Sequence, residues 1–119
     1  MFPAGYSTLV LGRPTPPCWR HMAPRPTKLE TSEVDGWLVA HPGWERDGDG
    51  IARAYTFADF GAAVGFTVRL GFVAEKRDHH PDVLVGWGKA RVFWTTHDAG
   101  GLTRLDLELA EAADSLAKP

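Results

Sequence analysis

The sequence predicts an α+β fold in which three helices pack on one face of a four-stranded antiparallel sheet. Two observations lead to this fold class. Three segments carry apolar residues at helical spacing, and between them lie two pairs of short runs rich in β-favouring residues, each pair joined by a glycine-containing turn. The expected order along the chain is therefore helix, two strands, helix, two strands, helix.

The first helix is expected to start at Thr31 or Ser32, because either hydroxyl can cap the first turn. Apolar residues follow at helical spacing until the Pro-Gly pair at 42 and 43 ends the helix. A strand then begins near Trp44, and the Asp-Gly repeat DGDG turns the chain into a second strand, IARAYTF. These segments form the first predicted hairpin.

The second helix is expected from Ala58 to about Arg77, opened by a capping box made of Thr56 and Asp59. It is apolar around most of its circumference, so we expect it to be covered on two sides, by the sheet and by a second partner. That partner is either another part of this chain or another subunit, and the sequence leaves both open.

The segments VLVGW and KARVFWTT are expected to form the second hairpin, with a turn near residues 86 to 89. Thr103 and Asp106 form another Thr-x-x-Asp pattern, which opens the last helix. The buried stripe of that helix is expected to contain Leu105, Leu109, Ala112 and Leu116.

Residues 1–28 differ from the rest of the chain, because they hold six of the nine prolines and show no sustained period. We expect a flexible extension there and a single domain over residues 29–119. Cys18 is the only cysteine, which excludes an internal disulfide and a cysteine-based zinc cluster.

Charge narrows the function classes. With 13 basic and 15 acidic residues, the chain has no broad field that would attract nucleic acid or an anionic membrane. No run approaches the ~18 apolar residues of a spanning helix. We therefore expect a cytoplasmic protein that binds a small, roughly neutral substrate or a protein partner.

Four motifs, in this order along the chain, resemble the pterin-4a-carbinolamine dehydratase family: GW at 43–44, YTFADF at 55–60, AEKRDHHPD at 74–82 and TTHDAGGLTRLD at 95–106. The resemblance covers Glu33 to Leu116. It implies a homodimeric or homotetrameric hydro-lyase that needs no metal or other cofactor. Such an enzyme dehydrates 4a-hydroxytetrahydrobiopterin to quinonoid dihydropterin in tetrahydrobiopterin recycling, with functional coupling to an aromatic amino acid hydroxylase.

By this resemblance, His79, His80 and His97 stand at the positions of the family's active-site histidines. Dehydration needs one proton delivered to the departing hydroxyl and another removed from the adjacent ring nitrogen. Imidazole suits both steps, because its unperturbed pKa of about 6.5 lies near working pH. We expect His80 and His97 to transfer protons and His79 to position the pterin and share its proton.

Further residues complete the expected site. Pro81 is expected to hold the turn, and Thr96, Asp98 and Ala99 to contact the pterin ring. The supporting residues are Glu75, Asp78 and Asp106. Asp106 has two roles open to it, the site or the helix cap, whereas for Glu75 a solvated helix end is favoured over orienting a histidine.

Three features qualify the resemblance. Val83 stands where many relatives carry an aromatic residue, which bears on substrate fit. Trp87 and Trp94 can stack on a flat heterocycle, although strand tryptophans more often fill a core or an interface. His21 and His41 lie outside the motifs and receive no role.

Two other function classes remain open. The three histidines with Asp78 or Asp98 could hold zinc, although no HxH or HxxxH spacing supports that site. A non-catalytic dimerisation cofactor or assembly factor of the same fold is the second alternative.

Overall fold

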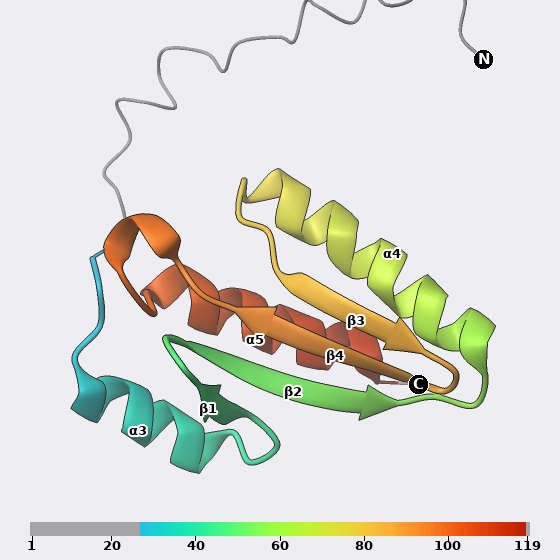
Figure 1. Ribbon diagram of the computed structural model, residues 1–119, viewed down its shortest axis with the longest axis horizontal. Coiled ribbons are helices and arrows are strands. Elements are labelled where there is room, and N and C mark those ends of the chain that lie inside the picture. The colour runs from blue at the N-terminus through green and yellow to red at the C-terminus, as the bar shows by residue number, and fades with distance from the viewer. Residues whose placement is uncertain (1–26, 119) are drawn as a thin grey trace, which may run out of the picture.

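The computed structural model describes residues 27–118, and Figure 1 shows their arrangement. Three helices and four strands follow one another in the predicted order, together with one short 3-10 helix: α3 (Thr31–Ala40), β1 (Glu45–Asp47), β2 (Gly50–Thr56), α4 (Phe60–Lys76), β3 (Asp82–Gly86), β4 (Lys89–Trp94), η1 (His97–Ala99) and α5 (Arg104–Ala117). The expected extension over residues 1–28 lies outside the described residues, apart from its last two. Lys28 already pairs with Thr103 in an isolated bridge.

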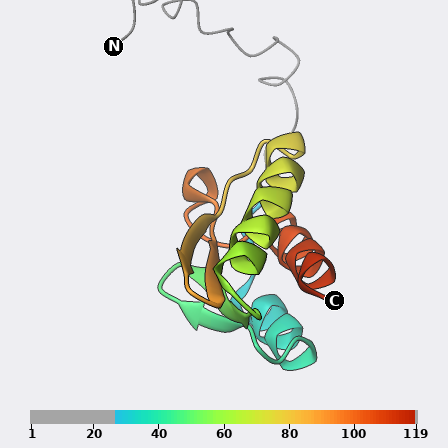
Figure 2. The same cartoon turned by 90° about the vertical axis from the view of Figure 1, so that its right-hand side faces the viewer.

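All strand pairs are antiparallel, and their order across the sheet is β1-β2-β4-β3. Figure 2 shows the helices gathered on one face of this sheet, which confirms the predicted fold class. Side chains alternate along β4. Val92 and Trp94 are fully buried on the helix side, whereas Arg91 and Phe93 are half-buried on the opposite face.

Helix starts were predicted less well than helix positions. α3 is capped by Glu30 in a capping box with Glu33, so Thr31 already lies inside the helix. α4 is capped by Asp59 itself, whose carboxylate accepts from the Ala62 N–H at 2.7 Å, and not by a Thr56–Asp59 box. At α5 the predicted box is confirmed, with Thr103 as the cap and Asp106 at its third position.

Within the described residues, α4 has only one of its two expected partners, and the buried stripe of α5 differs from the expectation. Four residues of α4 are buried against the rest of the chain: Ala63, Phe66, Leu70 and Ala74. The opposite face stays exposed, so within residues 27–118 the helix is covered on one side only. In α5 the fully buried positions are Asp106, Leu107, Leu109, Ala110 and Ala113, whereas the expected Leu105, Ala112 and Leu116 are half-buried.

None of the helices in the described part of the chain is long and apolar enough to cross a membrane.

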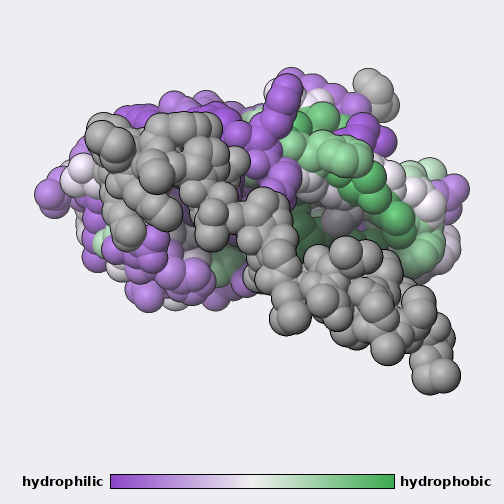
Figure 3. All heavy atoms as spheres, turned by 90° about the horizontal axis from the view of Figure 1, so that it is seen from above, coloured by the Kyte–Doolittle hydropathy of each residue, from purple (hydrophilic) through white to green (hydrophobic). Residues whose placement is uncertain are grey.

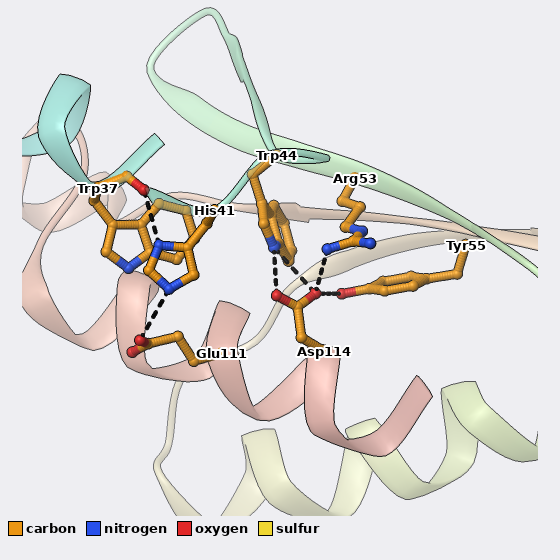
Figure 4. Close-up of polar contacts among 7 residues, drawn as sticks. All are labelled: Trp37, His41, Trp44, Arg53, Tyr55, Glu111 and Asp114. Carbon is orange, nitrogen blue, oxygen red and sulfur yellow. Dashed lines mark hydrogen bonds and ion pairs between the residues drawn. The ribbon is translucent and has the colours of Figure 1, made fainter. Parts of the chain in front are cut away.

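A carboxylate on α5 joins the first hairpin to the helix layer (Figure 4). Asp114 accepts hydrogen bonds from Trp44 Nε1 at 3.1 Å, Arg53 Nη1 at 3.0 Å and Tyr55 Oη at 2.5 Å. Burial raises the pKa of Tyr55, and the Asp114 carboxylate raises it further, so the phenol stays a donor.

The end of α3 is fastened to α5 beside this cluster. The His41 ring stacks on Trp37 with centroids 4.0 Å apart, and His41 Nε2 lies 3.2 Å from Glu111 Oε1 (Figure 4). β2, α3 and α5 therefore meet at one polar seam.

Replacing Asp114 with alanine should lower the free energy of unfolding by about 2 kcal/mol or more, because two donors and a guanidinium lose a shared, partly buried acceptor. Asp35→Ala is the matched control. It removes the exposed Asp35–Arg46 ion pair and should cost less than about 1 kcal/mol. Urea unfolding of both variants measures the two free energies of unfolding. Equal decreases would show that the Asp114 cluster stabilises the fold no more than an exposed ion pair does.

Candidate active site

A histidine and a buried carboxylate form the centre of the candidate site. His79 Nε2 lies 2.5 Å from Asp106 Oδ1, and the imidazole is stacked on Trp94 with centroids 5.8 Å apart. Asp106 is fully buried, whereas the His79 side chain keeps 13% of its surface exposed. The imidazole is therefore held by Asp106 at Nε2 and by Trp94 on one face, while part of the ring remains exposed.

The second oxygen of Asp106 is also saturated. Oδ2 accepts from Thr96 Oγ1 at 2.6 Å, from the Thr103 N–H at 2.9 Å and from Thr103 Oγ1 at 3.3 Å. A buried carboxylate is tolerated when donors surround it in this way. Asp106 therefore has both roles that the sequence left open, since it caps α5 and binds a site histidine.

This carboxylate fixes the protonation pattern of the neutral His79 ring. An ionised carboxylate only accepts hydrogen bonds, so Nε2 carries the hydrogen and Nδ1 keeps the lone pair. His79 thus offers Nδ1 as an acceptor for a ligand N–H.

The end of α4 turns the chain so that His79 can reach Asp106. Asp78 has a positive φ of 50°, the left-handed conformation that often follows a helix. The His79 N–H then donates to Ala74 O at 3.2 Å, which satisfies a carbonyl of the last helical turn. After this turn the two adjacent histidines contact different carboxylates.

His80 lies at the surface with a carboxylate partner of its own. Its Nε2 is 3.0 Å from Glu75 Oε2, and both side chains are more than half exposed. Glu75 is thus a solvated residue at the helix end, as favoured, and it also contacts His80, the other role that the sequence left open. Pro81 follows, half-buried, and leads into β3.

His97 sits where β4 gives way to η1. The preceding residue, Thr96, pairs with Gly101 through two backbone hydrogen bonds, and Gly100 takes the left-handed conformation with φ 76°. This small loop holds His97 and Asp98 exposed and Ala99 half-buried. His79 and Thr96 bind the two oxygens of the Asp106 carboxylate. His97 follows Thr96 directly in the chain, so its backbone lies close to this carboxylate.

A pocket of about 340 Å³ opens beside His97. It lies at the end of β4 and is lined by Asp47, Gly48, Asp49, Phe93, Thr95, His97, Gly100 and Gly101. A cavity of this size holds a small heterocycle.

The predicted residues therefore fall into three groups. His79, Thr96 and Asp106 form one hydrogen-bonded unit, and His80 pairs with Glu75. His97 lines the pocket. The Thr96 hydroxyl already donates to Asp106, so we treat Thr96 as a positioning residue. Asp78 supplies the turn.

Metal binding was the first alternative. Over residues 27–118 there is no group of three or more histidine, cysteine, aspartate or glutamate side chains able to hold a metal ion.

Some residues of the site were not found from the sequence. Thr103 was recognised as a helix cap but not as a donor to the site carboxylate. Trp94 was expected in the core and is there, yet it also supports the His79 ring. Phe93 and Thr95 line the pocket, and their position on one strand face was available from the alternation along β4.

Comparison with known proteins gives a family. The family model described as pterin 4 alpha carbinolamine dehydratase matches residues 27–116. A relative from Natronomonas pharaonis, named "Putative pterin-4-alpha-carbinolamine dehydratase", is 43% identical over 91 residues, which is 76% of this chain and 97% of the relative. A relative of the same name from Bradyrhizobium sp. is 54% identical over 77 residues, covering 63% and 78% of the two chains.

Two solved structures are similar. The "transcriptional coactivator/pterin dehydratase" from Brucella melitensis aligns with a TM-score of 0.74 and 33% identity, over 77% of this chain and all of that one. A pterin dehydratase-like protein described as a RuBisCO assembly factor of the α-carboxysome aligns with a TM-score of 0.55 and 19% identity, over 65% of this chain and 92% of that one. The second likeness extends to the fold alone.

Replacing Asp106 with asparagine should reverse the His79 tautomer, because an amide N–H facing Nε2 favours the ring that carries its hydrogen on Nδ1. The ring ¹⁵N chemical shifts of His79 measure this change. The variant should also lose about 2 kcal/mol of stability, since the Thr96 and Thr103 donors lose a carboxylate acceptor. Glu75→Gln, which alters only the exposed His80 pair, is the control and should leave the His79 shifts unchanged. Unchanged shifts in Asp106→Asn would contradict the assignment.

Proposed function

The chain belongs to the pterin 4 alpha carbinolamine dehydratase family, and from this premise we propose that it dehydrates 4a-hydroxytetrahydrobiopterin to quinonoid dihydropterin, within tetrahydrobiopterin recycling. The observation that carries the proposal is the buried Asp106, which holds His79 in one tautomer directly beside the strand end that presents His97. The relatives' printed names support the same substrate class.

The reaction breaks the C4a–O and N5–H bonds and forms an O–H bond and a C4a=N5 double bond. The bond between C4a and its hydroxyl oxygen breaks while a proton is delivered to that oxygen, so that water leaves. The lone pair of the neighbouring N5 forms the C4a=N5 double bond, and the N5 proton is removed by a base. One group must therefore act as an acid and another as a base, and imidazoles are suited to both.

Each histidine takes a role from its environment. His80 and His97 are exposed at the surface and at the pocket, where they can exchange protons with substrate and water. Glu75 orients His80 by accepting its Nε2 hydrogen bond. His79 is held more firmly than either, so its Nδ1 positions the pterin by accepting an N–H and shares that proton. In this assignment no step uses a metal or an organic cofactor.

We also propose that the enzyme is a homo-oligomer. Phe60, Val64, Val68 and Phe72 are spaced four residues apart along α4 and are between 36% and 71% exposed. We call these four residues the α4 stripe, and Figure 3 shows hydrophobic side chains gathered in a band there. An apolar stripe of this length is typical of a contact with another protein surface, and a second α4 stripe offers a matching one.

The α4 stripe also fits the non-catalytic alternative, because a dimerisation cofactor or an assembly factor would bind its partner through an apolar face as well. That alternative predicts binding without turnover. A cytoplasmic location and functional coupling to an aromatic amino acid hydroxylase accompany the enzyme proposal and stay predictions.

Replacing His80 or His97 with alanine should each lower dehydration turnover by about 100-fold or more, the usual effect of losing a general acid or base. Stopped-flow absorbance with synthetic 4a-hydroxytetrahydropterin measures the rate above the uncatalysed background. His41→Ala is the control, because His41 contacts Trp37 and Glu111, which belong to none of the histidine motifs. This variant should keep the wild-type turnover. Wild-type protein that adds nothing to the background rate would sink the proposed activity, and unaltered rates in both variants would remove these residues from the mechanism.

Val68→Glu combined with Phe72→Glu should convert the oligomer to a smaller species, because the charges would be buried at the contact. Light scattering after size-exclusion chromatography measures the mass. Val39→Glu changes a still more exposed apolar residue, on α3, and should leave the mass unaltered. A wild-type protein that is monomeric at micromolar concentration would refute the oligomer.

A further inference from the structure

The pocket beside His97 is bounded by the turn between β1 and β2. Gly48, with φ 57°, and Asp49 form this turn, and Asp49 O accepts a hydrogen bond from Thr95 Oγ1 at 3.1 Å. This hydrogen bond fastens the turn to the residue that follows β4. Asp49 therefore has a fixed place at the pocket edge.

An aromatic ring forms the floor of the pocket. Phe93 lies on the face of the sheet that no helix covers, and its ring passes over Gly50. A Cβ at position 50 would lie 2.6 Å from the Phe93 ring and 2.3 Å from Trp94 O, so only glycine allows this close approach. A flat heterocycle can stack on such a ring.

Two carboxylates line the pocket, and they differ in what they already bind. Asp47 Oδ2 accepts from Arg91 Nη2 at 2.7 Å. The Asp49 carboxylate has no hydrogen bond or ion pair with any group of residues 27–118. Asp49 is thus the acceptor that a ligand can engage without displacing a protein group.

We propose that Asp49 is a specificity-determining residue that binds the amino-pyrimidinone end of the pterin, and this inference rests on the proposed function. That end of the ring presents two donors side by side, the N3 hydrogen and the 2-amino group, and a carboxylate accepts both in a two-point contact. Phe93 supports the ring from below, and His97 lies on the same pocket wall.

The strand order makes this orientation productive. Asp49 lies on the β2 side of β4, whereas His80 precedes β3 on its other side. Neighbouring strands are about 4.8 Å apart, so the two flanks of β4 are separated by about 10 Å, close to the length of a two-ring heterocycle with its hydrogen-bond partners. A pterin bound at Asp49 by its pyrimidine end therefore extends its C4a and N5 atoms past His97, over the end of β4, toward the flank where His80 precedes β3.

Calorimetric titration with pterin and with lumazine tests this assignment, because lumazine carries a carbonyl in place of the 2-amino group. Wild-type protein should bind pterin about tenfold more tightly than lumazine, and Asp49→Asn should lose this preference. The variant should also raise KM for the carbinolamine about tenfold with little change in kcat. Asp47→Asn is the matched control, since it lines the same pocket but is already paired, and it should keep the preference.

The outcomes separate the two proposals. Wild-type protein that turns over the carbinolamine but does not distinguish pterin from lumazine overturns the role of Asp49 and leaves the activity standing. The same conclusion follows if Asp49→Asn keeps the wild-type preference. Wild-type protein that neither binds pterin nor accelerates dehydration overturns the proposed function and this inference together.

Discussion

The structure depends on the need to satisfy one buried negative charge. Asp106 has no exposed surface, and a carboxylate in that position is stable only while donors surround it. Its donors come from distant parts of the chain, namely the turn after α4, the end of β4 and the first turn of α5. The same hydrogen bonds therefore assemble the helix layer and set the His79 ring, so fold and site cannot be altered independently here.

This arrangement also answers why two histidines stand side by side. Adjacent residues in an extended chain face opposite ways, and His79 and His80 do so here, with separate carboxylates as partners. The left-handed Asp78 gives the inward direction to His79. His80 is left near solvent, where protons are available. The turn at Asp78 therefore leaves one imidazole against a buried carboxylate and the other paired with an exposed one.

The sequence predicted the order of the elements because helical and strand periods, and the Gly-containing turns, are local signals. It failed where a local pattern had two solutions, as at Asp59, which caps α4 with its own carboxylate instead of completing a box with Thr56. The sequence indicated that α4 has a second apolar face but not whether this chain covers it, since burial depends on what packs nearby. Among the site residues, the resemblance identified the histidines, but only the three-dimensional contacts join Asp106 to Thr96 and Trp94 to His79.

The contacts of Lys28 and Leu29 have a practical consequence. The Leu29 N–H donates to Leu102 O at 2.8 Å and Lys28 pairs with Thr103, so the first described residues are attached to the segment between η1 and α5. A purification tag or fusion partner that replaced residues 1–26 would therefore start beside the segment between η1 and α5, close to the loop that carries His97. The opposite terminus leaves from the far end of α5 (Figure 1) and is the safer place for an affinity handle or a fluorescent label in kinetic work.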